Sequence, residues 1–320
     1  MDLPKNGTYK QRFFERLRNI SPPTNDTEFQ WAETPNKLTC CIVEPRMMEE
    51  LRGVLYNIAK IYGQQTQTEE QGQEQIQKDI GLTIFHGTNN EAFVKGIVKK
   101  WKNVVLYNLN EENLTRKQYS ELLTKRWFYE QFVSSHVLIF QTDSYLFRQI
   151  PEEYYKYDYV GAPWRDTLGN GCGNGGISLR RVKTMHDVAT ETGTTEPEDV
   201  YFSRQNIKVC TKEIELHKHF SVEHIFVKNP VCCHQPWYSM RFPFANNIKN
   251  NNNKPNNKTN NKPNNKTNNK PNNKTNNKPN NKNNNNSNNK NNNKKINDPE
   301  LKRKIETHKK MYDDFLKNIK

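Results

Sequence analysis

Short, mostly apolar runs alternate with segments of helical spacing through the first half of the chain, and this alternation constrains the fold most. Almost every position in these runs is apolar, which is typical of strands buried on both faces. We expect strands at 38–43, 82–85, 104–107 and 137–140, and helices at 47–62, 91–99 and 119–132. The pattern predicts an α/β domain with a largely parallel sheet flanked by helices on both faces.

A second segment cannot form a core. The 46 residues at 250–295 contain only Asn, Lys, Pro, Thr and Ser, and the unit PNNKTNNK recurs every eight residues. A repeat with no apolar position has no face to stack. It also buries nothing that would offset about 1–2 kcal/mol of backbone entropy per ordered residue. We therefore predict a disordered linker over 246–297, slightly extended by its lysines.

The net charge of +14 comes entirely from the residues after 246. Residues 247–320 hold 19 Lys and Arg against 5 Asp and Glu, whereas residues 1–246 hold 30 of each kind. The part able to fold is therefore neutral, which argues against a basic nucleic-acid-binding domain. Weak contact of the tail with nucleic acid or an anionic surface remains open.

The apolar residues and cysteines exclude further classes of protein. No apolar run reaches the roughly 18 residues of a membrane span, and the first residues show no apolar stretch typical of a secretion signal. The six cysteines include two adjacent pairs and no CxxC spacing. They indicate neither a disulfide framework nor a zinc site, so we expect reduced thiols and a cytoplasmic protein.

We expect four parts along the chain. They are an N-terminal extension over 1–35, a folded domain over 36–245, the linker over 246–297 and an amphipathic helix over 298–320. The last helix begins with a capping Asp, a Pro and a Glu. Its apolar residues then recur at spacings of three and four. The sequence does not decide whether this helix docks on the domain or binds a partner, and it does not place the extension.

Two clusters follow the predicted strands, where α/β sheets bind ligands. In the segment QTDS at 141–144, Asp143 is placed to hold a cation, or else Asp143 or Ser144 caps a helix over 145–150. Five glycines between 169 and 176 let the backbone approach a ligand closely, or they form a surface loop. A helix over 177–188 would place their amides at its positive end.

Two further clusters contain titratable groups. Glu198 and Asp199 lie at a predicted helix start, where adjacent carboxylates usually complement the helix dipole. One of them could instead act as a general base toward a substrate hydroxyl. His234 lies in the segment CCHQPW at 232–237. An isolated histidine is more often satisfied within a core, or exposed, than bound to a metal.

Taken in order, these and other short motifs resemble one family. They are EPR at 44–46, FHG at 85–87, QTDS at 141–144, YDYVGAPW at 157–164, GNGGISLR at 173–180, EDVYF at 198–202, FSVE at 220–223 and H-x-P-W at 234–237. They resemble a domain of unknown function that is widespread in giant amoebal viruses and fungi, and which is similar to GT-A-type glycosyltransferases. The resemblance implies a GT-A-like α/β fold with a mixed, mostly parallel sheet flanked by helices. The resemblance covers about residues 38–237. The Asn/Lys repeat is similar to tracts of mimivirus proteins, and a viral origin would imply a host cytoplasm or a virion as the location.

The resemblance implies a metal-dependent hexosyltransferase that transfers a sugar from a nucleotide-diphosphate donor to a glycan or protein acceptor, with inversion. It implies that Asp143 and His234 hold the metal and that Asp199, or else Glu198, is the base. The substrate-binding residues that it implies are Glu44, Arg46, Trp164, Asn174, Gly175, Gly176 and Arg180. Gln141 stands where such enzymes usually carry the first acid of a DxD motif.

A carboxylate, an imidazole and phosphate oxygens would form a mixed site that suits Mn²⁺ better than Mg²⁺, because imidazole is a poor magnesium ligand. The cation would stabilise the charge that develops on the leaving diphosphate. Two other functions remain open on the sequence. One is a degenerate relative that binds nucleotide or glycan without turnover, which the missing first acid favours. The other is an interaction protein whose basic tail binds nucleic acid.

Overall fold

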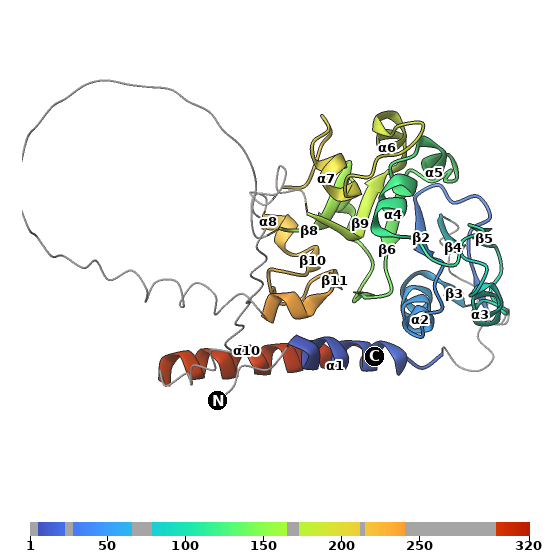
Figure 1. The fold of residues 1–320 in the computed structure, drawn as a ribbon. Coiled ribbons are helices and arrows are strands. Elements are labelled where there is room, and N and C mark those ends of the chain that lie inside the picture. The colour runs from blue at the N-terminus through green and yellow to red at the C-terminus, as the bar shows by residue number, and fades with distance from the viewer. Residues whose placement is uncertain (1–5, 23–27, 66–78, 165–172, 212–214, 241–298) are drawn as a thin grey trace, which may run out of the picture.

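The computed structural model describes residues 6–22, 28–65, 79–164, 173–211, 215–240 and 299–320. A six-stranded sheet forms its centre, in the order β5-β4-β2-β6-β9-β8 (Figure 1). The strands are β5 (Val104–Asn108), β4 (Ile80–His86), β2 (Leu38–Glu44), β6 (His136–Phe140), β9 (Asn174–Arg181) and β8 (Tyr159–Ala162). The first four run parallel, and β9 runs antiparallel to both of its neighbours. The predicted mixed, mostly parallel sheet is therefore confirmed.

Helices cover both faces of this sheet and create two cores. They are α1 (Asn6–Arg18), α2 (Glu50–Tyr62), α3 (Glu91–Ile97), α4 (Arg116–Leu123), α5 (Arg126–Glu130), α6 (Val182–Val188), α7 (Glu198–Ser203), α8 (Glu215–Lys218) and α10 (Pro299–Lys317), with 3-10 turns η1 (Glu152–Tyr154) and η2 (Pro236–Met240). Successive side chains of a strand point to opposite faces. In β2, Cys40 and Ile42 accordingly enter the core beneath α1 and α2, while Cys41 and Val43 enter the core beneath α4 to α7. The strand sequences are continuously apolar because both faces of the sheet are buried.

The N-terminal segment and the C-terminal helix both pack on the first of these cores. In Figure 1, α1 and α10 lie side by side along one edge of the molecule, with the Tyr9 and Tyr312 rings 4.9 Å apart. Arg12 of α1 donates to Asp313 of α10 at 2.6 Å. A side chain at Gly53 of α2 would collide with the backbone of Leu17, so this glycine permits the close approach of α1 and α2.

The apolar stripe of the C-terminal helix therefore docks on the folded part of the chain. The buried apolar residues are Ile305, Tyr312, Phe315 and Leu316 of α10, and Ile319 just after it. The Phe315 ring contacts the rings of Phe147 and Phe226 at 5.1 and 5.7 Å. This settles the alternative that the sequence left open. The predicted linker over 246–297 lies outside the described residues, as does Cys172.

The described residues also form two smaller sheets. β10 (Ser221–Val222), β11 (Cys232–His234) and β7 (Ser144–Leu146) form one, with β11 antiparallel to β7. β1 (Phe29–Gln30) and β3 (Gln64–Gln65) form the other. The strand β3 occupies the start of the glutamine-rich stretch 64–77, and residues 66–78 lie outside the described residues.

Three helix predictions are wrong. Residues 145–150 do not form a helix, because 144–146 pair with β11 as β7. Residues 177–181 belong to β9, where Ile177 and Leu179 enter one core while Ser178 and Arg180 point to the other face. Only 182–188 are helical, so no helix begins at the glycines. The helix expected over 119–132 divides at Lys125, whose extended backbone forms a bridge with Thr190.

None of the described helices is long and apolar enough to cross a membrane.

Candidate functional site

The clusters predicted from the sequence meet at one edge of the central sheet. The register pairs Ile42 of β2 with Phe140 of β6, and Phe140 with Ile177 of β9. The carboxyl ends of β2 and β6 and the amino end of β9 therefore lie together, and Ala162 at the end of β8 pairs with Asn174. In sheets of this kind, ligands bind beyond the carboxyl ends of the strands.

Asp143 and His234 face each other at this edge. Ser144 of β7 pairs with His234 of β11, which brings Asp143 beside the imidazole ring. Oδ1 of Asp143 lies 3.2 Å from Nε2 of His234, and the two side chains are 18% and 4% exposed. Burial opposes ionisation of both groups, but their mutual attraction outweighs it. This attraction lowers the pKa of Asp143 and raises the pKa of His234 to about 10.

Two further residues hold this pair. Nε2 of Gln235 donates to Oδ2 of Asp143 at 2.7 Å, and the backbone N–H of Gln235 donates to the Asp143 carbonyl at 3.1 Å. Gln235 adopts a positive φ of 45°. Glu223 places Oε1 3.5 Å from Nδ1 of His234. The imidazole thus lies between two carboxylates, and each of its nitrogens faces one of them.

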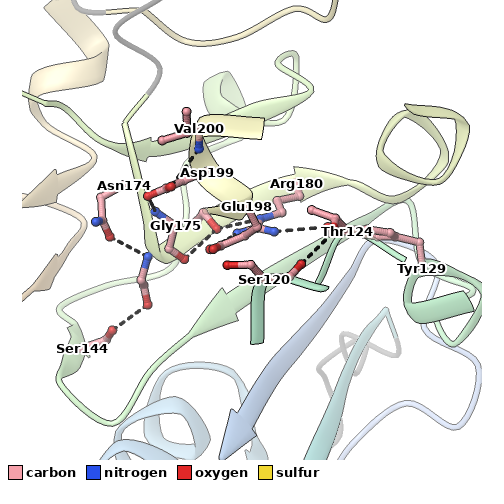
Figure 2. A network of polar contacts seen from close by, with 12 residues as sticks. Ser120, Thr124, Tyr129, Ser144, Asn174, Gly175, Arg180, Glu198, Asp199 and Val200 are labelled. Atoms are coloured by element: carbon pink, nitrogen blue, oxygen red, sulfur yellow. Dashed lines mark hydrogen bonds and ion pairs between the residues drawn. The ribbon is translucent and has the colours of Figure 1, made fainter. Parts of the chain in front are cut away.

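The glycines at the start of β9 form the surface on which these side chains rest. A Cβ at Gly176 would collide with the His234 ring, so this glycine gives the imidazole its place. The N–H of Gly176 donates to Asn174 Oδ1 at 2.7 Å, and its carbonyl accepts from Ser144 Oγ at 3.0 Å (Figure 2). The backbone of 174–176 is therefore held in one position by its neighbours.

Asp199 lies on the other side of the same glycines. Gly175 N–H donates to Asp199 Oδ2 at 3.2 Å, and Val200 N–H donates to Oδ1 at 2.8 Å (Figure 2). Burial, and then the neighbouring carboxylate of Glu198, raise the pKa of Asp199 to about 7 despite these two donors. A carboxylate with a pKa near neutrality can take up a proton at physiological pH.

Glu198 and Arg180 form an ion pair behind the glycines. Arg180 Nη2 lies 3.3 Å from Glu198 Oε1, and the guanidinium also donates to Ser178 and Tyr129. Arg180 is completely buried, and its guanidinium lies over the rings of Tyr159 and Phe202. A Cβ at Gly175 would meet Arg180 Nη2 at 2.9 Å. Arg180 therefore supports the glycines and Glu198 from within the core.

The remaining residues that the resemblance implies lie at the same edge. Arg46 pairs through two nitrogens with Glu44, at 2.8 and 2.7 Å. The Arg46 side chain is 50% exposed, whereas that of Glu44 is 5% exposed, so the guanidinium is the part available to a ligand. Trp164 follows β8 and is largely buried against the second core.

The donor set fits a divalent cation that also takes ligands from a bound molecule. Asp143 Oδ1 and His234 Nε2 are buried without an aligned hydrogen bond to a described residue. Two adjacent ligands about 2.2 Å from an octahedral cation lie about 3 Å apart, close to the observed 3.2 Å. Within the described ranges, no three His, Cys, Asp or Glu side chains converge on one point. The pair supplies two ligands, and phosphate oxygens and water would supply the others.

A cavity of about 750 Å³ lies elsewhere, between β7, residues 226–230 and α10. Phe147, Phe226 and Phe315 line it, and the residues of the edge do not. The candidate site is therefore defined by its side chains and backbone rather than by this cavity.

Sequence reasoning gave no role to Glu223, Gln235 or Tyr129. Glu223 belongs to the FSVE motif, which was a signal of its position. Its role depends on the pairing of β10 with β11, which the sequence does not reveal. Tyr129 belongs to a helix on the opposite side of Arg180, and no local pattern links the two residues.

A protein-family model matches the part of the chain that contains most of this site. Residues 103–234 match a family model described as "Protein of unknown function (DUF5672)". The DUF5672 stretch begins just before β5 and ends at His234. It includes Asp143, the glycines of β9 and Asp199, whereas Glu44 and Arg46 precede it. A search of curated proteins finds no match.

Proposed function

We propose that this protein is a metal-dependent glycosyltransferase that uses a nucleotide-sugar donor and inverts the transferred sugar. One observation carries the proposal. A pair of side chains suited to a cation, Asp143 and His234, and a carboxylate with a raised pKa, Asp199, lie on two sides of the same three backbone residues, 174–176.

The donor would bind on the Asp143 side. Asp143 and His234 would hold Mn²⁺, which stabilises the negative charge that develops on the leaving diphosphate. Arg46 is half exposed at the end of β2 and presents a permanent positive charge to the nucleotide. Gly175 and Gly176 have no side chain and let the sugar approach the backbone closely.

The acceptor would bind on the Asp199 side. Its hydroxyl oxygen forms a bond to the anomeric carbon while the bond from that carbon to the diphosphate breaks. The hydroxyl proton passes to the Asp199 carboxylate, and the electron pair of the broken bond leaves with the diphosphate. A positioned base typically contributes about 10²–10⁴-fold to such a step. The pKa of Asp199 is raised to about 7, which suits a base at neutral pH, so Asp199 is preferred to Glu198 for this role.

Release of nucleoside diphosphate tests the proposal. The full chain would be incubated with UDP-, GDP- and CDP-linked hexoses, with and without Mn²⁺, and with glycan and protein acceptors. We expect metal-dependent release with one donor class, with the sugar recovered on an acceptor by mass spectrometry. Asp143→Ala should abolish release while the protein stays folded. Release that is unchanged in Asp143→Ala would refute the metal assignment.

A second function has its own support. Gln141 replaces the first acid of the usual motif, and the described residues include no third ligand for the cation. Both features favour a relative that binds nucleotide or glycan without turnover. Donor binding with no release across the acceptor panel would support this function over the first. Replacing the lysines of residues 250–295 by Gln, which leaves the docked α10 in the chain, would separate either function from contact of the basic tail with nucleic acid.

A further inference from the structure

The carboxylate of Glu223 faces Nδ1 of His234, the ring nitrogen that does not face Asp143. Glu223 directly follows β10, whose Val222 pairs with Cys233, the residue before His234. Oε1 of Glu223 lies 3.5 Å from Nδ1 of His234, which is an ion-pair distance, and each side chain is 4% exposed. Nδ1 is buried and has no aligned hydrogen bond to a described residue. Among the described residues, His234 is the only basic group within ion-pair distance of Glu223.

The surroundings of Glu223 direct it to this nitrogen. Its other oxygen, Oε2, is buried and has no hydrogen-bond partner in the described part of the chain. Removing a carboxylate from water is unfavourable unless a partner compensates its charge. The His234 imidazole lies beside the Glu223 carboxylate and can compensate its charge. The ladder between β10 and β11 fixes the distance between the two residues.

A doubly protonated imidazole cannot bind a metal, so a cation at Nε2 must displace the proton there and leave the remaining proton on Nδ1. Glu223 can only accept at Nδ1, so it favours the form with the proton there and leaves the Nε2 lone pair directed toward Asp143. Without Glu223, the proton could reside on Nε2 and be donated to Asp143 Oδ1, 3.2 Å away. The cation would then lose one of its two protein ligands.

We propose that Glu223 is a positioning residue that holds His234 in the ring orientation and tautomer that bind a divalent cation through Nε2. This inference rests on the proposed metal site and extends it by one residue. Carboxylates behind a metal-bound histidine typically change metal affinity by about 10–100-fold. The same range is expected here.

Mn²⁺ binding tests the role without any need for catalysis. Free Mn²⁺ would be titrated with the full chain by electron paramagnetic resonance, alone and with UDP, GDP or CDP. We expect Glu223→Ala to weaken Mn²⁺ binding about 10–100-fold. Glu223→Gln should weaken it less, since the amide oxygen still accepts from Nδ1–H. Glu153→Ala removes an exposed carboxylate elsewhere on the surface and should leave the affinity unchanged.

The outcomes separate this inference from the proposed function. If the wild-type chain binds no Mn²⁺ with any nucleotide, the metal site itself is refuted. If the wild type binds Mn²⁺ and Glu223→Ala binds it equally well, the metal site stands and the role of Glu223 is refuted. Equal losses in Glu223→Ala and Glu223→Gln would also refute it, because an accepting oxygen would then not matter.

A spectroscopic measurement covers the case in which Glu223→Ala does not fold. Nitrogen chemical shifts of ¹⁵N-histidine-labelled wild-type protein would be recorded with Cd²⁺, which is diamagnetic. A proton on Nδ1 and metal on Nε2 of His234, assigned by its loss in His234→Gln, supports the inference. A proton on Nε2 overturns it.

Discussion

Replacing Asp199 by Asn should separate a catalytic base from a structural hydrogen-bond acceptor. The pKa of Asp199 is raised from 3.8 to about 7, chiefly by burial and then by Glu198. The folded state therefore favours the neutral carboxyl group, whereas the unfolded chain ionises near pH 4. Stability conferred by the neutral form is present below pH 4 and is lost as the pH rises toward 7.

The size of this effect follows from the pKa values. Each unit of pKa difference is worth about 1.4 kcal/mol, and the part of the titration between pH 5 and pH 8 amounts to about 2–3 kcal/mol. The wild-type protein should lose this stability over that range, while Asp199→Asn, which cannot ionise, should not. At pH 8 the variant should therefore be relatively more stable than at pH 5. Its turnover should fall about 10²–10⁴-fold.

Urea denaturation at pH 5, 6, 7 and 8, followed by tryptophan fluorescence, measures the difference between wild type and variant. Asp187→Asn is a matched control, because Asp187 is exposed on α6 and Lys183 lowers its pKa. This control should show no such gain with rising pH. If Asp199→Asn is destabilised equally at every pH, Asp199 acts only as an acceptor for the N–H groups of Gly175 and Val200. The assignment of the base would then be wrong.

Three further substitutions test the packing around the site. Gly176→Ala should displace the His234 ring, lower the free energy of unfolding by about 1–3 kcal/mol and weaken Mn²⁺ binding. The control Gly96→Ala, which has open space at its Cβ, should be neutral or slightly stabilising, and equal melting temperatures of the two variants would contradict the close contact at Gly176. Arg180→Met should cost about 3–5 kcal/mol, because it leaves Glu198 buried and unpaired, and a loss below about 1 kcal/mol in urea denaturation would refute the pairing. Tyr312→Ala should cost about 3–5 kcal/mol and speed hydrogen exchange in α10, and unchanged exchange there would contradict its docking.

The central sheet could be predicted because its strands are buried on both faces. The runs at 38–43, 82–85 and 137–140 are mostly apolar for this reason, and each lies within an observed strand. β9 could not be predicted in the same way. Its polar side chains include Arg180, which is buried only because Glu198, Tyr129 and Tyr159 surround it. Those partners come from three other elements, so no local pattern indicated a strand.

The candidate site shows the same division. Asp143 could be located from sequence because it directly follows an apolar strand. Its partner His234 lies in β11, far along the chain, and the sequence around it favoured a structural role over metal binding. Glu223 depends on the pairing of β10 with β11, which is set by tertiary packing. Docking of α1 on α2 likewise depends on a glycine contact that spacing does not predict.

Nucleotide-induced thermal stabilisation tests the central claim most directly. The full chain would be melted with UDP, GDP and CDP, each with and without Mn²⁺, alongside Asp143→Ala and the control Asp187→Ala. A ligand at 100 times its Kd stabilises the folded state by about 2.7 kcal/mol, which corresponds to a shift of about 5–10 °C for a protein of this size. We predict such a shift with one nucleotide, dependent on Mn²⁺, lost in Asp143→Ala and kept in Asp187→Ala. A cooperative melt that no nucleotide shifts would contradict the account.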